Sequence, residues 1–203
     1  EAIYAYNGRG NSLFALNQVE VAINSYNQAI ALNPELPDPY NGKGNALLKL
    51  GRIGDAVDAY SKAIELRPSA ACYSNQADAF MVIGRYEEAL FAYQQVINLQ
   101  PNDFNVHNNM GQALAILGRY EEAIIAYDRA ITINPNFVQS YENKANVLFV
   151  THHPIESLEL YDKALSRTSN NLDVYILLNK KGEVLSSVGQ YQEAIELYDK
   201  AIL

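Results

Sequence analysis

Three short stretches of the sequence contain residue types that perform chemistry in other proteins. Cys72 is the single cysteine and could act as a thiolate nucleophile, the adjacent His152 and His153 could bind a metal ion, and the stretch 41–45 (NGKGN) could bind a phosphate. Each lacks what its chemistry needs. No base is placed near Cys72, neighbouring side chains on a turn point apart, and NGKGN lacks the full Gly-x-x-x-x-Gly-Lys-Ser/Thr spacing. The sequence therefore predicts no catalytic residue, no metal site and no cofactor.

Side-chain amides, in contrast, return at regular intervals along the chain. An amide has both a donor and an acceptor, so a row of amides can pair with the C=O and N–H groups of an extended peptide. Asn is a mediocre helix former, and its repeated use at helical positions favours a binding role. The alternative is that these amides bond to one another or to water. The candidate peptide-binding residues are Asn7, Asn11, Asn41, Asn45, Asn75, Asp78, Asn108, Asn109, Gln112, Asn143 and Asn146.

The elements that must position these amides form a repeat. The stretch from Gly84 to Pro101 (GRYEEALFAYQQVINLQP) returns as Gly118 to Pro135 (GRYEEAIIAYDRAITINP), and looser copies occur along the whole chain. The residue after the acidic pair gives the spacing, which is 34, 33, 34, 34 and 37 residues between Ala22, Ala56, Ala89, Ala123, Ser157 and Ala194. The period predicts a single array of six units at about 3–36, 37–69, 70–103, 104–137, 138–174 and 175–203.

Each unit contains two apolar segments at helical spacing, separated by a short connection that usually contains Gly. Gly51, Gly84, Gly118 and Gly189 stand where a helix needs a left-handed C-terminal cap, and a Pro closes most units. No segment alternates as a strand does, so the sequence predicts an all-α chain of helix hairpins. The longer last spacing predicts three extra residues in the connection around 166–172.

These patterns resemble the tetratricopeptide repeat family. Unit four has the family's spaced positions at His107, Met110, Gly111, Leu114, Ala123, Tyr127, Ala130 and Pro135, although the family's Trp is absent throughout. The resemblance implies a right-handed α-solenoid whose first helices line a concave groove. The line Asn75, Asn109 and Asn143 is similar to the asparagine ladder in the tetratricopeptide superhelix of O-linked N-acetylglucosamine transferases, which holds peptide backbones.

Charge and hydropathy narrow the choice of partner. The formal net charge is −8, and most acids fall on the second helix of each unit, which is expected to form a solvated outer face. Nucleic acid would call for a basic stripe instead. No apolar run reaches the roughly 20 residues that span a bilayer, so no membrane partner is expected. A lone cysteine points to the reducing cytoplasm.

The sequence therefore predicts a non-enzymatic scaffold that binds an extended protein or peptide segment through the groove. One alternative is a regulatory or substrate-presenting part of a larger enzyme, such as a glycosyltransferase or a kinase. A second alternative is a structural module that packs through the ends of the array. The chain starts at Glu1 without Met and stops within a helix, so we expect a piece of a longer protein. We also expect self-association through an uncapped apolar C-terminal end.

Overall fold

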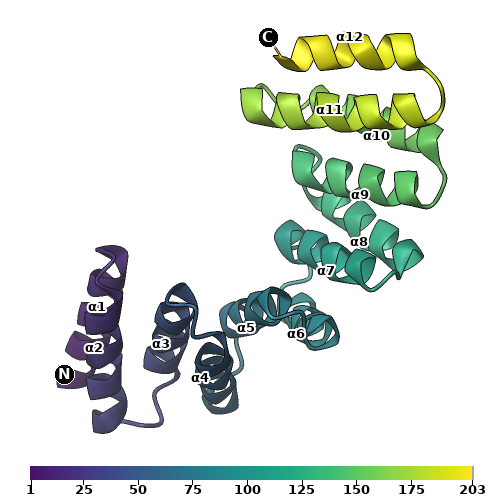
Figure 1. Ribbon diagram of the computed structural model, residues 1–203. Coiled ribbons are helices and arrows are strands. Elements are labelled where there is room, and N and C mark those ends of the chain that lie inside the picture. Colours follow the sequence, from purple (N-terminus) through teal and green to yellow (C-terminus); the bar gives the residue numbers. More distant parts are fainter. Residues whose placement is uncertain (203) are drawn as a thin grey trace. The chain divides into compact units, whose positions relative to one another are not determined.

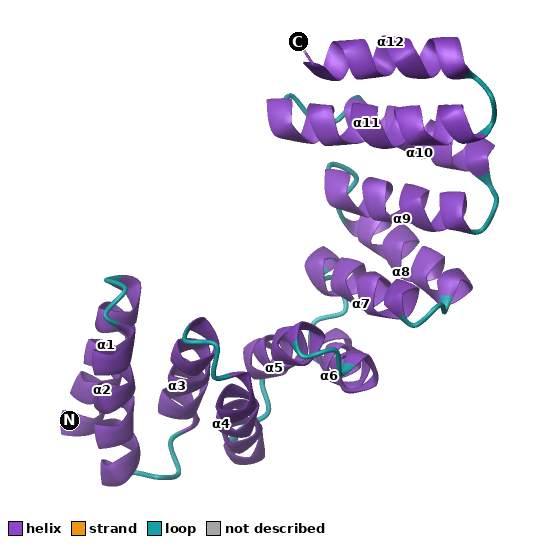
Figure 2. Ribbon diagram, in the orientation of Figure 1, coloured by secondary structure: helices purple, strands orange, loops and turns teal. Residues whose placement is uncertain are grey.

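The computed structural model describes residues 1–202, and in this range it contains α-helices and no strand (Figures 1 and 2). Consecutive helices form antiparallel hairpins, one for each sequence repeat, so odd-numbered helices are the first helices and even-numbered helices the second. The helices are α1 (Ala2–Ala15), α2 (Val19–Leu32), α3 (Pro37–Lys49), α4 (Ile53–Leu66), α5 (Ala70–Val82), α6 (Tyr86–Leu99), α7 (Phe104–Ile116), α8 (Tyr120–Ile133), α9 (Val138–Val150), α10 (Pro154–Leu165), α11 (Asn171–Ser187) and α12 (Tyr191–Ile202).

Each hairpin is one of the repeats. The hairpins group into two larger compact bodies of three hairpins each, Glu1–Pro101 and Asn102–Leu203, which are called the first and the second unit below. Within each unit the second helix of one hairpin packs on the first helix of the next, as α2 does on α3 and α8 on α9. First helices of adjacent hairpins also touch, as α1 and α3 do. The predicted all-α solenoid of tandem helix-turn-helix repeats is confirmed.

The turn inside each hairpin is fixed by one residue with left-handed backbone. Gly51 has a φ of 74°, and next to it the N–H of Arg52 donates to the carbonyl oxygen of Leu47 at 2.9 Å. This is the six-to-one bond of a helix end that turns through a left-handed residue. Asn17 and His152 occupy the same place in repeats one and five, with φ of 62° and 64°. The chain therefore makes the same turn without glycine at these two positions.

A buried tyrosine holds the two helices of each hairpin together. Tyr60 of α4 is fully buried between Ala56 and Ala63 of its own helix and Gly44 of α3. A Cβ on Gly44 would lie 2.4 Å from Cε1 of the Tyr60 ring, so this residue must be small for the helices to approach. The predicted packing side of the hairpin is therefore confirmed.

The connection between the last two repeats differs from the expectation. The prediction placed the extra residues in a connection reaching residue 172, but Asn171 and Leu172 are helical. The Oδ1 atom of Asn170 caps this helix by accepting from the N–H of Leu172 at 2.9 Å. Helix α11 thus has 17 residues where α9 has 13, and most of the extra length is a longer helix. The N-cap asparagine explains the earlier helix start.

Candidate functional site

The predicted site residues lie on one face of the first helices, which we call the amide face. Four of them accept a hydrogen bond from the tyrosine that lies 15 residues later on the second helix of the same hairpin. The tyrosine-hydroxyl-to-oxygen distances are 2.9 Å for Tyr26 to Asn11, 2.8 Å for Tyr60 to Asn45, 2.7 Å for Tyr93 to Asp78 and 2.6 Å for Tyr161 to Asn146. This bond was not predicted from the sequence, although the constant spacing of 15 residues was its signal.

A second set of amides joins neighbouring repeats. In the first unit, Nδ2 of Asn75 donates to Oδ1 of Asn41 at 3.0 Å. In the second unit, Nδ2 of Asn143 donates to Oδ1 of Asn108 at 3.0 Å, and the hydroxyl of Ser140 donates to the same oxygen at 3.1 Å. The alternative in which amides bond to one another is thus present at these four residues.

These internal bonds fix which end of each amide faces outward. Asn45 and Asn146 use Oδ1 for the tyrosine, so Nδ2 is left as a donor. Asn75 and Asn143 use Nδ2 for the neighbouring repeat, so Oδ1 is left as an acceptor. All four residues are partly exposed. The first unit therefore presents an oriented donor on α3 and an oriented acceptor on α5, and the second unit presents both on α9.

The remaining predicted residues do not follow this pattern. Oδ1 of Asn7 is buried and has no partner among residues 1–202, because Gly42 stands where Asn75 stands one repeat later. Oδ1 of Asn109 accepts from Nδ2 of Asn108 at a long 3.4 Å. The side chain of Gln112 is partly exposed and forms no hydrogen bond within the described part of the chain. The structure thus divides the amides into oriented and unoriented groups.

Exposed apolar residues follow the amides on the first helices α5, α7 and α9, and sequence reasoning missed them. Val82, Ile116 and Val150 stand four residues beyond Asp78, Gln112 and Asn146, which places them one helical turn further along the same face. Their exposed fractions are 65%, 56% and 56%. The signal lies in the same position of every repeat. It holds an apolar residue in repeats three to five, whereas repeats two and six have Lys49 and Ser187 there.

Neighbouring repeats are also joined by a polar pair on the other side of the first helix, which we call the junction pair. Lys144 of α9 contacts Asp128 of α8, and Lys181 of α11 contacts Asp162 of α10, each with an N–O distance of 2.5 Å. At the matching place in the first unit, Nε2 of Gln76 donates to the hydroxyl of Ser61 at 2.8 Å. Both lysine side chains are largely buried, while the two aspartate side chains are more than half exposed.

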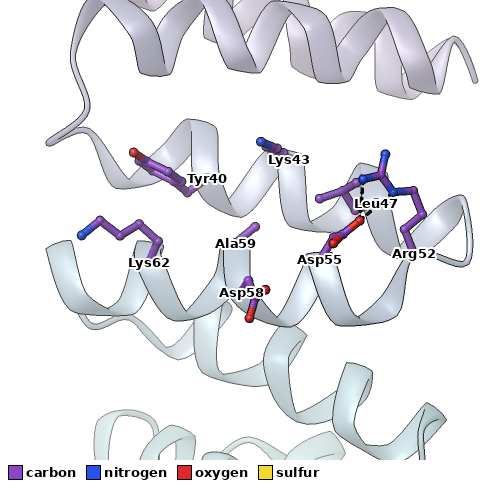
Figure 3. Close-up of a pocket in the computed structure, with 8 residues that line it drawn as sticks. All are labelled: Tyr40, Lys43, Leu47, Arg52, Asp55, Asp58, Ala59 and Lys62. Atoms are coloured by element: carbon purple, nitrogen blue, oxygen red, sulfur yellow. Dashed lines mark hydrogen bonds and ion pairs between the residues drawn. The ribbon is translucent and has the colours of Figure 1, made fainter.

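Lys43 occupies the junction position of repeat two but has no acid opposite, since Asn27 stands there. Figure 3 shows Lys43 and Tyr40 above Asp55 and Lys62, where they line a cleft of about 330 Å³ between α3 and α4. Equivalent clefts occur between α9 and α10 and between α11 and α12. The cleft is therefore a property of the hairpin and does not mark a special site.

The three stretches with possible chemistry have ordinary surroundings. Cys72 is buried, and burial raises the pKa of its thiol. NGKGN lies inside α3, and Nδ1 of His153 lies 3.3 Å from Oγ1 of Thr151 in a turn. Residues 1–202 include no group of three or more His, Cys, Asp or Glu side chains that could hold a metal ion. In that same range no helix is both long and apolar enough to cross a bilayer.

The fold and the repeated contacts define a helical solenoid of the repeat-protein class. Four profiles described as TPR or tetratricopeptide repeats match residues 10–51, 37–69, 74–136 and 175–203. The chain belongs to the tetratricopeptide repeat family. No curated protein sequence matches it.

Solved structures show the same fold at low sequence identity. The crystal structure of MamA protein has a TM-score of 0.78 at 23% identity, covering 82% of this chain and 92% of MamA. YrrB, a TPR protein with an unusual peptide-binding site, has a TM-score of 0.73 at 21% identity, with 83% and 87% covered. A tetratricopeptide repeat protein from Parabacteroides merdae ATCC 43184 has a TM-score of 0.84 at 17% identity, with 99% and 79% covered.

Proposed function

We propose that this chain is a protein-interaction scaffold that binds an extended peptide segment along the amide face of its first helices. Family membership supports the general role, and the similarity to YrrB, a TPR protein with an unusual peptide-binding site, supports the kind of partner. The observation that carries the proposal is the orientation of the free amide groups. Asn45 and Asn146 present donors, while Asn75 and Asn143 present acceptors.

An extended peptide backbone needs this combination of groups. Its carbonyl oxygens accept and its N–H groups donate. An oriented donor and an oriented acceptor, on adjacent helices in the first unit and on one helix in the second, can therefore bind both without reading side chains. Internal bonds hold the amides in place before the peptide arrives, which lowers the entropic cost of binding. In the second unit, the exposed Ile116 and Val150 add apolar contacts for side chains of the peptide.

The experiment selects binders from a library of unstructured peptides displayed on phage and measures affinity by calorimetry. Asn75→Ala and Asn143→Ala are each expected to weaken binding about threefold to tenfold, as the loss of one hydrogen bond does. Asn24→Ala is the matched control, because Asn24 is an exposed amide on the second helix α2. Methylating a backbone nitrogen of the peptide is expected to weaken binding similarly.

Two further measurements separate backbone recognition from other contacts. Tyr60→Phe leaves Asn45 in place but removes the hydroxyl that orients it, so affinity is expected to fall without loss of any direct contact. Raised salt is expected to change affinity little, since the contacts are between neutral groups. Normal binding by the Asn75→Ala, Asn143→Ala double variant, or loss of binding in salt, contradicts the proposal.

A further inference from the structure

One position of the amide face is charged in a single repeat. It lies three residues before the small residue of each first helix, and in repeats one to six it holds Asn7, Asn41, Ser74, Asn108, Glu142 and Asn179. Glu142 is thus the one ionisable residue at this position. It lies on α9, one helical turn before Asn146, which presents a donor on the same face. A carboxylate therefore stands within the candidate peptide site of the second unit.

Glu142 lacks the contact with the next first helix that its position has elsewhere in the unit. In the hairpin before it, Asn108 accepts a hydrogen bond from Asn143 of α9 at 3.0 Å. The residue that matches Asn143 on α11 is Lys180, but its Nζ atom lies 3.3 Å from Oε2 of Glu183 on its own helix. Among residues 1–202, Glu142 therefore forms no ion pair.

The surroundings of Glu142 compensate its charge only in part. The residue is partly buried, and this burial raises the pKa of its carboxyl because a carboxylate loses contact with water. Two smaller effects lower the pKa, namely a hydrogen bond from Nε2 of Gln139 to Oε2 of Glu142 at 3.0 Å and the nearby charge of Lys180. A cation placed beside the Glu142 carboxylate would offset the cost of burial.

The neighbouring groups leave this part of the face negative. After burial, the charges of Glu142 and Glu183 are what raises the pKa of the Tyr161 hydroxyl, which donates to Asn146 at 2.6 Å. Two carboxylates therefore lie near the amide that presents a donor. Only Glu183 is paired with an ammonium group, that of Lys180, within the described residues. Charge complementarity at this place favours a cationic partner group.

We propose that Glu142 selects peptides with an arginine or lysine side chain, which pairs with its carboxylate while the peptide backbone lies on Asn143 and Asn146. This inference rests on the proposed peptide binding and adds a sequence preference to it, since the amides alone bind any backbone. The matching residues of the first unit are neutral, as Asn41 and Ser74 are. The preference therefore belongs to the second unit.

Peptides selected from the phage library test the inference. Those whose binding is weakened by Asn143→Ala occupy the second unit, and they are expected to contain an arginine or a lysine. Replacing the arginine of such a peptide by citrulline, a neutral side chain of similar shape, is expected to weaken binding about fivefold, and so is Glu142→Gln. The two changes together are expected to weaken binding no more than either change alone, because both remove the same ion pair.

Glu121→Gln is the matched control. It also removes one negative charge from the second unit, but at an exposed residue of the second helix α8. Affinity and the effect of citrulline are expected to stay as in the natural chain. Raised salt is expected to weaken binding of the arginine peptide a fewfold at most in the natural chain and to have little effect in Glu142→Gln, where the neutral amide bonds remain.

The outcomes separate this inference from the proposed function. If Asn143→Ala weakens binding but citrulline has the same effect in the natural chain and in Glu142→Gln, the selection by Glu142 is wrong and peptide binding stands. An equal loss in Glu121→Gln shows a general effect of net charge and also overturns the inference. If Asn143→Ala weakens binding of no selected peptide, the proposed function fails in the second unit, and the inference fails with it.

Discussion

At the residue scale, the hydroxyl of the buried tyrosine of a hairpin has two roles. It links the two helices of the hairpin, and it orients the amide of the same repeat. Burial raises the pKa of the Tyr60 hydroxyl, and the nearby Asp78 carboxylate adds to this effect. The pKa values of Tyr26, Tyr127 and Tyr161 are also raised by burial. These side chains therefore stay neutral in the folded chain at pH values where an unfolded chain ionises.

The raised tyrosine pKa values predict loss of stability in alkali. An ordinary tyrosine titrates near pH 10, so the stabilisation is complete below about pH 10 and falls as the pH rises further. The free energy of unfolding, measured in urea, is expected to fall less steeply above pH 10 in Tyr60→Phe than in the natural chain. Tyr4→Phe is the control, because Tyr4 is 70% exposed. An unchanged slope in Tyr60→Phe contradicts the prediction.

His152 stores backbone strain at the turn of the fifth hairpin. Its φ of 64° matches the turn that Gly51 makes without strain. His152→Gly is expected to raise the free energy of unfolding by about 0.5–1 kcal/mol, less than the full left-handed penalty because glycine also frees the unfolded chain. His153→Gly, with a φ of −113°, is the control and is not expected to stabilise. Equal effects of the two changes, measured by urea unfolding, would count against this account.

At the scale of the element, the effect of a glycine in a helix depends on whether it faces the other helix of the hairpin or solvent. Gly44 of α3 faces the Tyr60 ring, which cannot retreat freely because its hydroxyl is bonded to Asn45. Gly54 of α4 is exposed, and a Cβ there would meet nothing within 4 Å. One glycine is thus required for packing, and the other only weakens its helix.

The two glycines predict a change of sign for the same substitution. Gly44→Ala is expected to lower the free energy of unfolding by about 1–3 kcal/mol, because the ring and the helix must shift. Gly54→Ala is expected to raise it by about 0.5–1 kcal/mol through helix propensity. Thermal unfolding of the two variants measures both. Destabilisation by Gly54→Ala, or a neutral Gly44→Ala, would show that the assigned sides of the hairpin are wrong.

At the scale of the whole molecule, stability comes from contacts between adjacent hairpins, because no single core joins all of them. Each compact unit stacks three hairpins, and the helices at the two ends of the chain, α1 and α12, have a neighbour on one side only. In such arrays the stability is close to a sum of repeat and interface contributions. The end repeats are therefore the first to open.

Amide hydrogen exchange at low protein concentration is expected to show this gradient. Protection should be lowest in α1 and α12 and higher in inner helices such as α3 and α9, since opening an end repeat breaks one interface and opening an inner repeat breaks two. Uniform protection along the chain at low concentration contradicts the nearest-neighbour description.

The sequence by itself determined the repeat, the hairpins, the turns and the packing side, because these features depend on residues close together in the chain. Gly51 marks a turn, and the spacing of Gly44, Ala56 and Tyr60 marks a seam, through local geometry alone. Only the tertiary structure decided what the amides do. Asn75 bonds to Asn41, 34 residues away, and a sequence pattern shows that an amide recurs without showing which of its two ends is used.

A sequence pattern does not show which distant residues meet, and this explains the features that sequence reading missed or misplaced. Whether Val82 is exposed depends on which neighbouring helices cover it, and its apolar type suggests burial. The extra residues before repeat six are helical because Asn170 caps the start of α11. The spacing alone does not show whether such residues extend a helix or lengthen a loop. The junction pairs require two surfaces to meet in register. Residue spacing fixes which side chains share a face, and only packing between repeats fixes what each face contacts.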